Sequence, residues 1–152
     1  MHERILEILI FSIPEATVIF CLAFSLSDKK ISGFQLAVMG VTLGILANLV
    51  RGMVESYILN ICILSIITIF LLKILGKFSV YEAATSALTS ISLYLIIEFL
   101  NVKSLQILTG INPTRLGEEF YLKVLWFLPQ VAYAIVISCI IRYIISRQPD
   151  RE

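Results

Sequence analysis

Five polar residues stand within or beside long apolar runs of this sequence, where side chains of their types are costly without a role. They are Glu15, Asn48, Arg51, Glu55 and Gln130. Asn48, Arg51 and Glu55 follow one another at intervals of three and four residues, which places them on one face of a helix. Ionisable groups in membrane spans are rare and mark functional sites. We therefore predict that these five residues bind a ligand.

Three arrangements of this polar group fit the sequence. In the first, Arg51 forms a buried ion pair with Glu15 or Glu55 and has a structural role. In the second, the group lines a polar cavity that opens to the outside and binds a small ligand or peptide. In the third, it belongs to a transport path, which needs polar groups in the inner half, where only Glu82 and Lys73 are available. That half is otherwise apolar, which favours a pocket over a channel.

The residue types needed for catalysis and metal binding are scarce. His2 is the single histidine and lies at the N-terminus, so we expect no Ser–His or Cys–His pair within the membrane. The cysteines occupy separate apolar runs without the spacing of a metal site (Cys21, Cys62 and Cys139). We expect a protein that is not an enzyme, with no catalytic residues, no metal ligands and no cofactor.

The composition indicates which kind of element carries these residues. Of the 152 residues, 59% are hydrophobic and 15% are charged, the formal net charge is +1 and the mean hydropathy is +0.94. Soluble domains have about 45–50% apolar and about 25% charged residues, so the apolar excess is expected to face lipid. The composition excludes a disordered chain, a nucleic-acid-binding protein and an ordinary soluble enzyme.

Five apolar runs are long enough to cross a membrane as helices, because one crossing needs roughly 20 mostly apolar residues. None alternates with a period of two, so helices are favoured over a membrane barrel. The predicted fold is all-α, a polytopic bundle of about five transmembrane helices in one domain, residues 1–152. The predicted spans are 5–27, 31–50, 56–75, 80–100 and 120–146, with a loop or interfacial segment at 101–119.

Small residues in the second and fourth spans predict that helices approach one another closely there. The second span has Gly40 and Gly44 between Ala37 and Ala47, and the fourth has Ala83, Ala87 and Ser90. We interpret both sets as packing surfaces between helices of the same chain. A homodimer interface is the alternative.

Positive charges predict the orientation, since cytoplasmic loops carry an excess of lysine and arginine. One side of a five-span bundle carries seven cations, namely Lys29, Lys30, Lys73, Lys77, Arg142, Arg147 and Arg151. The other carries five, namely Arg4, Arg51, Lys103, Arg115 and Lys123. We predict a multi-pass protein of the cell inner (cytoplasmic) membrane, with the N-terminus outside and the C-terminus in the cytoplasm.

Short motifs in the chain resemble a known family. They are Ser12-Ile13-Pro14-Glu15-Ala16, the turn Asp28-Lys29-Lys30, Asn48-Leu49-Val50-Arg51, and Leu128-Pro129-Gln130 before a last helix that ends in arginines. With these motifs the chain resembles the N-terminal multi-helix membrane region of Firmicutes sensor histidine kinases of the GHKL class. The resemblance implies a signal-receiving bundle in which Glu15, Arg51 and Pro129 match the recurrent pattern.

The chain also departs from that family. Sensor kinases continue into a phosphoacceptor helix and an ATP-binding domain, whereas this sequence ends at Glu152. We expect a sensor-like bundle without an output domain of its own, either a complete small protein or a piece of a sensor.

The predicted function is a sensor-like binding or regulatory subunit of a larger membrane assembly, non-enzymatic and with a polar pocket in its outer half. Its expected partners are membrane lipid, a membrane protein (a kinase, a transporter or a second copy) and a small ligand or peptide, but no nucleic acid. Two alternatives remain open. One is a small transporter or ion-coupled permease subunit, and the other is a purely structural subunit.

Overall fold

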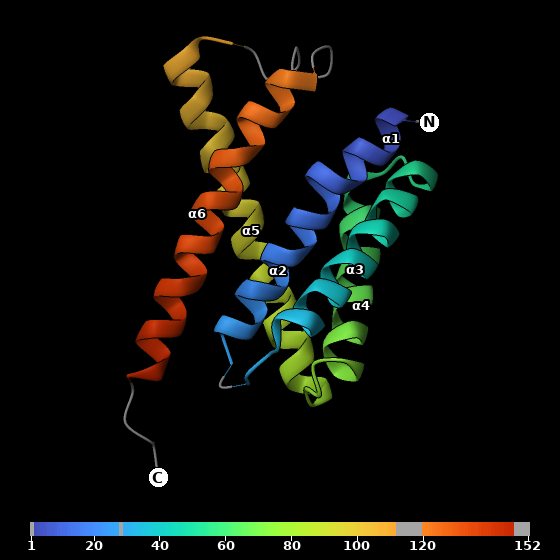
Figure 1. Ribbon diagram of the computed structural model, residues 1–152, viewed down its shortest axis with the longest axis vertical. Helices are drawn as coiled ribbons and strands as arrows, with labels where there is room; N and C mark the ends of the chain where they lie inside the picture. Colours follow the sequence, from blue (N-terminus) through green and yellow to red (C-terminus); the bar gives the residue numbers. More distant parts are fainter. Residues whose placement is uncertain (1, 28, 112–119, 148–152) are drawn as a thin grey trace.

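The computed structural model describes residues 2–27, 29–111 and 120–147, and in these ranges it consists of helices and short connections (Figure 1). The helices are α1 (His2–Glu7), the π-helical turn η1 (Ile8–Ser12), α2 (Ile13–Ser25), α3 (Gly33–Met53), α4 (Tyr57–Ile74), α5 (Val80–Thr109) and α6 (Phe120–Ser146). Because α1, η1 and α2 follow one another without a break, they form one rod. The predicted all-α bundle is confirmed.

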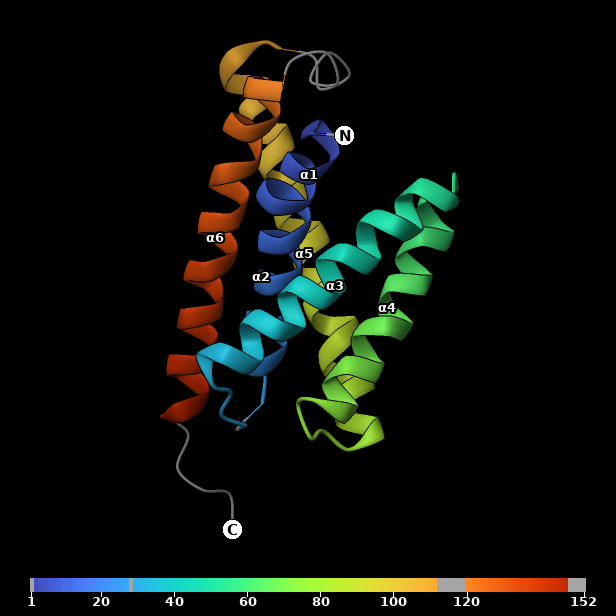
Figure 2. The ribbon, with the colours of Figure 1, turned by 45° about the vertical axis from the view of Figure 1, so that its right-hand side comes forward.

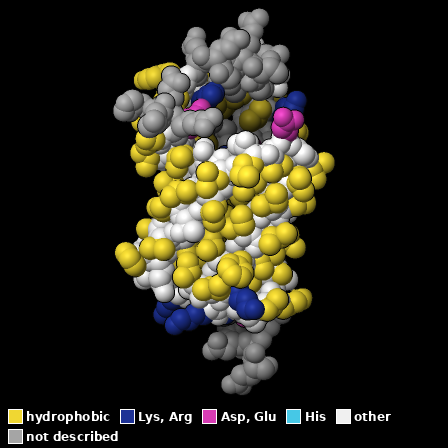
Figure 3. All heavy atoms as spheres, turned by 90° about the vertical axis from the view of Figure 1, so that its right-hand side faces the viewer, with side chains coloured by type: hydrophobic (Ala, Val, Ile, Leu, Met, Phe, Trp, Pro, Cys, Tyr) yellow, Lys and Arg dark blue, Asp and Glu magenta, His cyan; other side chains and the backbone are white. Residues whose placement is uncertain are grey.

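Within the part of the chain that the structure describes, five helices are long and apolar enough to cross a membrane. They are Ile5–Ser25, Gly33–Met53, Tyr57–Ile74, Val80–Thr109 and Phe120–Ser146. Hydrophobic side chains cover the middle of the face in Figure 3, and the charged side chains visible there lie toward its two ends. This distribution matches a protein whose middle is surrounded by lipid, and it supports a multi-pass membrane protein.

Three of the helices begin at a serine that caps them. Ser32, Ser56 and Ser79 each accept a hydrogen bond from the backbone N–H three residues later, which satisfies a donor that has no partner within the helix. At Ser32 and Ser79 a side chain at the third helical position, Gln35 or Glu82, accepts a hydrogen bond from the backbone N–H of that serine in return. These serines place the starts of α3, α4 and α5.

The first rod changes its hydrogen-bonding pattern just before a proline. In η1 the Ile13 N–H donates to the carbonyl of Ile8, five residues back, instead of four. Pro14 follows at the start of α2 and has no N–H to donate. A π-helical turn adds one residue to the helix, and such turns are frequent at functional sites. Here the turn precedes Glu15 by three residues and contains Ser12, which is buried.

Helix α2 is the central element of the bundle. It packs against α3, α5 and α6, whereas α4 packs against α3 and α5. In Figure 2, α3 crosses α2 obliquely and α4 stands on the side away from α6. The N-terminus, the end of α3, the start of α4, the end of α5 and the start of α6 share one end of the molecule (Figure 1). We call it the N-terminal end, and the other the opposite end.

Gly40 and Gly44 of α3 pack against the first rod, as predicted for packing within the chain, whereas Ala37 is exposed. A Cβ built at Gly44 would lie 2.9 Å from the backbone of Ile13, and one built at Gly40 would overlap the side chain of Thr17. On α5, Ala83, Ala87 and Ser90 are likewise buried. The predicted packing surfaces are thus used inside this bundle.

Helix α5 is longer than the predicted span. We expected 101–119 to be a loop or interfacial segment, but Asn101 to Thr109 continue the helix, and 112–119 lie outside the described residues. No glycine or proline occurs before Gly110, which ends α5 with a left-handed φ of 69°. Thirty residues make a helix of about 45 Å, longer than a hydrocarbon core of about 30 Å. The last turns of α5 accordingly project past the other helices (Figures 1 and 2).

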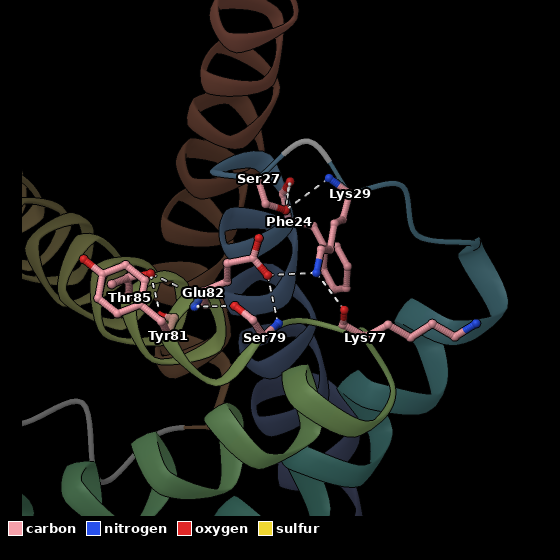
Figure 4. Close-up of polar contacts among 8 residues, drawn as sticks. All are labelled: Phe24, Ser27, Lys29, Lys77, Ser79, Tyr81, Glu82 and Thr85. Atoms are coloured by element: carbon pink, nitrogen blue, oxygen red, sulfur yellow. Dashed lines mark hydrogen bonds and ion pairs between the residues drawn. The ribbon is translucent and has the colours of Figure 1, made fainter. Parts of the chain in front are cut away.

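At the opposite end, Lys29 links the α2–α3 connection, in which it lies, to the α4–α5 connection. Lys29 Nζ donates to the carbonyl of Lys77 at 2.6 Å and to Glu82 Oε2 at 2.9 Å, and it lies 4.6 Å from the centre of the Phe78 ring (Figure 4). Glu82 also accepts from the backbone N–H of Ser79. Glu82 therefore caps α5 and, through Lys29, joins the α2–α3 and α4–α5 connections. It does not belong to the polar group around Arg51 at the N-terminal end.

Candidate functional site

Glu15 and Arg51 form an ion pair near the N-terminal end of the bundle. The Nη2 atom of Arg51 donates to both carboxylate oxygens of Glu15 at 2.8 Å. The Glu15 side chain is 20% exposed and that of Arg51 is 40% exposed. Of the two partners that the sequence left open for Arg51, the structure selects Glu15. The pair joins α2 to the last turn of α3.

A cavity of about 520 Å³, the central cavity, lies beside this pair. Its lining comes from η1, α2, α3, the α3–α4 connection, α4, α5 and α6. On α4 it runs from Tyr57 past Asn60 and Leu64 to Thr68. Tyr57 and Thr68 are eleven residues apart, which corresponds to about 17 Å along a helix, more than half the thickness of a hydrocarbon core of about 30 Å. Its volume is in the range of small-molecule sites, roughly 300–1,000 Å³.

The central cavity is polar near the N-terminal end and apolar in its depth. Glu15, Arg51, Glu55, Tyr57 and Glu98 lie toward the N-terminal end. Further in, the lining is mainly apolar, with Ala16, Ile19, Leu43, Leu64 and Ile91. Such a gradient suits a molecule with one polar end and one apolar end.

Two buried polar atoms in the lining have no hydrogen-bond partner among the described residues. They are the hydroxyl of Tyr94 and the Oδ1 atom of Asn60. Tyr94 is 2% exposed and Asn60 is 8% exposed. A buried polar group without a hydrogen bond costs about 1–3 kcal/mol, and such groups in folded proteins are few. Both residues line the cavity, and the side chain of Gln130 lies near the Tyr94 hydroxyl.

The opposite end of the bundle closes the central cavity with a packed apolar core. Phe20, Phe24, Leu72 and Phe78 are each at most 4% exposed, and the rings of Phe24 and Phe78 pack edge to face with centres 5.1 Å apart. The hydroxyl of Thr68 donates to the carbonyl of Leu64 in its own helix. The lining of the central cavity ends at Thr68, before this core, which is the geometry of a pocket.

A second cavity of about 690 Å³, the lateral cavity, lies between the end of α3 and the helices α5 and α6. Both cavities are lined by Phe11, Ser12, Arg51, Phe127 and Gln130. The rings of Phe11 and Phe127 pack edge to face with centres 5.2 Å apart. These shared residues form the partition between the two cavities.

Two polar contacts fasten the helices around the lateral cavity. The side-chain amide of Asn101, on α5, donates to the carbonyl of Trp126, on α6, at 2.7 Å. Lys123 Nζ lies 3.6 Å from Glu7 Oε1, which joins α6 to α1. The α5–α6 contact lies three residues before Pro129, inside α6.

The structure places all five predicted ligand-binding residues in the lining of these cavities. Glu15, Arg51, Glu55 and Gln130 line the central cavity, and Asn48 lines the lateral cavity together with Arg51 and Gln130. Gln130 is buried, Glu15 and Asn48 are partly buried, and Glu55 is exposed. Whether these residues bind a ligand stays a prediction.

Sequence reasoning missed Tyr94, which is buried and has an unpartnered hydroxyl. It lies within an apolar run, where a tyrosine resembles any other large hydrophobic residue. A signal was present, because Ile91, Tyr94, Leu95 and Glu98 follow at intervals of one, three or four residues and Glu98 is ionisable. All four line the central cavity.

Comparison with known proteins adds no relative. No protein-family model, curated protein or solved structure matches this chain. Function must therefore be argued from the cavity and its residues.

Proposed function

We propose that this protein is a non-enzymatic, multi-pass membrane protein that binds a small ligand in the central cavity and acts as a sensor-like, regulatory subunit of a larger membrane assembly. The observation that carries the proposal is a ligand-sized cavity lined by an intramembrane ion pair and by two buried polar atoms, on Tyr94 and Asn60, without hydrogen-bond partners. A scaffold that only supports other helices has no need of such a cavity.

The position of the cavity gives a route from binding to a partner. Helices α2, α3, α4, α5 and α6 all contribute lining residues, so an occupant contacts every rod of the bundle. A ligand shifts a conformational equilibrium by its difference in affinity for the two states. Ligand binding can thus change the relative positions of helices whose outer faces contact a partner.

Filling the cavity tests ligand binding. Ile61 lines the central cavity, whereas Ile66, on the same helix, is 67% exposed on the outer surface. Native mass spectrometry of protein purified in mild detergent should detect a bound small molecule in the wild type and in Ile66→Trp. It should be absent from Ile61→Trp, because the added ring occupies the cavity. Equal retention by both variants would show that the molecule binds elsewhere and would contradict the proposal.

Purification from the native membrane tests the regulatory part. A partner should co-elute at fixed stoichiometry with the wild type and with Ile66→Trp, and Ile61→Trp should change the partner's activity or its share of the eluate. A monomer that elutes alone, with no bound small molecule, would overturn the sensor-like role. Solute uptake into proteoliposomes by the purified chain would instead identify a transporter.

A further inference from the structure

The carboxyl groups of the central cavity exceed its cations. Among the described residues, its lining has three glutamates, Glu15, Glu55 and Glu98, and one arginine, Arg51. Three formal negative charges and one positive charge leave a sum of −2. Arg51 already donates to both oxygens of Glu15, and among the described residues neither Glu55 nor Glu98 has an ion-pair partner. Glu98 is partly buried on α5, so the site has a spare acidic group one turn from Tyr94.

Of the two unpartnered atoms in the lining, Asn60 Oδ1 lacks a hydrogen-bond donor, whereas the Tyr94 hydroxyl lacks a partner of either kind. Asn60 Oδ1 can only accept, and the Tyr94 hydroxyl can accept as well as donate. Both residues are more than nine-tenths buried and, like Glu98, they line the central cavity. Carboxylate, amide oxygen and phenol together match an ammonium group, which donates three hydrogen bonds and accepts none.

The aromatic and apolar lining matches the rest of such a molecule. Tyr57, Tyr94, Phe11 and Phe127 line the cavity, and aromatic faces attract cations that are removed from water. Below the polar groups, Ile19, Leu43, Leu64 and Ile91 provide an apolar surface. A hydrocarbon tail directed toward Thr68 would be removed from water there, while the charged end stays beside Glu98.

We propose that the central cavity binds an amphipathic amine, with its ammonium group among Glu98, Tyr94 and Asn60 and its alkyl tail along the apolar part of the cavity. This inference rests on the proposed function and adds the chemical class of the ligand. The competing occupant is an amphipathic carboxylate, held by the N–H groups of Arg51 that do not contact Glu15. The negative sum of charges and the unpartnered Asn60 Oδ1, which can only accept, favour the amine, whereas the Tyr94 hydroxyl could partner either class.

Photolabelling tests the class of ligand directly. The protein is reconstituted in phosphatidylcholine nanodiscs and exposed to dodecylamine, dodecanol or dodecanoate, each with a diazirine in its tail. Mass spectrometry then locates the labelled residues. The amine should label lining residues of α4 and α5, such as Leu64 and Leu95, and unlabelled dodecylamine should abolish this labelling. Its apparent affinity should exceed that of the alcohol by about tenfold or more, as expected for a charge-assisted hydrogen bond.

Two glutamine variants assign the preference to one carboxyl group. Glu98→Gln should reduce the amine-to-alcohol ratio to about one and leave labelling by the alcohol unchanged, which also shows that the variant is folded. Glu7→Gln is the control, because Glu7 lines only the lateral cavity, and it should keep the preference. Adding phosphatidylethanolamine to the nanodiscs distinguishes a lipid headgroup, which would compete with the probe, from a free amine.

The outcomes separate the two proposals. Stronger cavity labelling by the alcohol or the carboxylate than by the amine would overturn the amine assignment and leave the cavity as a ligand site. An amine preference that survives Glu98→Gln would also overturn the assignment. Failure of all three probes to label the cavity saturably would contradict both the amine and the proposed ligand-binding function.

Discussion

Arg51 both links two helices and lines the candidate site. Its guanidinium group joins α3 to α2 through Glu15, and its side chain also lines both cavities. Removing one member of a partly buried pair leaves the other without a partner, whereas replacing both by apolar residues removes the need for pairing. The consequences of single and double replacement therefore differ.

We predict that Arg51→Leu and Glu15→Leu each lower the free energy of unfolding by about 1–3 kcal/mol, because each leaves a charge unpaired. The double variant should lose less than the sum of the two single changes. Chemical unfolding in detergent micelles, followed by circular dichroism, measures the three values as a double-mutant cycle. Additive losses would mean that the two side chains do not interact.

At the scale of helices, the close contact of α3 with the first rod brings Arg51 to Glu15. Gly44 permits this contact, since a Cβ there would lie 2.9 Å from backbone atoms of Ile13, which cannot swing aside as a side chain would. Gly52 lies eight residues later on the same helix, and a Cβ at that position meets nothing within 4 Å. The two glycines form a matched pair for mutation.

Gly44→Ala should destabilise the protein by about 1–3 kcal/mol, as overpacking does in well-packed interiors. Gly52→Ala should be neutral or stabilise it by up to about 1 kcal/mol, because alanine favours the helix. Thermal unfolding of both variants in the same detergent provides the comparison. Equal melting temperatures would show that α3 does not depend on its close contact with the first rod at Gly44.

Because this contact positions Arg51, Gly44→Ala should also weaken binding in the central cavity.

At the scale of the whole molecule, the two ends differ in chemistry. The N-terminal end contains the Glu15–Arg51 pair and the polar part of the central cavity, whereas the opposite end has aromatic packing and the contacts of Lys29. The sequence predicts seven cations on one side of the membrane against five on the other. From this excess we propose that the polar part of the central cavity faces away from the cytoplasm.

Reporter fusions test the orientation in bacterial cells. Green fluorescent protein fused after Glu152 should fluoresce, and alkaline phosphatase fused at the same position should be inactive, because we expect this end in the cytoplasm. Alkaline phosphatase fused within the α3–α4 connection, near Glu55, should be active. The reverse pattern at both positions would place the polar part of the central cavity toward the cytoplasm and contradict the proposed orientation.

Local chemistry along the chain was enough to predict the fold class and the approximate helices. Apolar runs of about twenty residues leave few alternatives in lipid, because backbone groups there must form their hydrogen bonds within a helix or a closed barrel. The face formed by Asn48, Arg51 and Glu55 followed from helical periodicity. The end of α5 was misplaced, because residues 101–109 are less apolar yet contain nothing that stops a helix before Gly110.

Contacts between helices decided the rest, and these depend on how distant segments pack. Spacing along the chain left Glu15 and Glu55 as equal partners for Arg51, and only the approach of α3 to the first rod at Gly44 selects Glu15. Tyr94 became part of the site for the same reason, since its hydroxyl is buried without a partner only once α2 and α6 pack against α5. A helix's own pattern shows which face is polar, but the partner of that face is decided by tertiary packing.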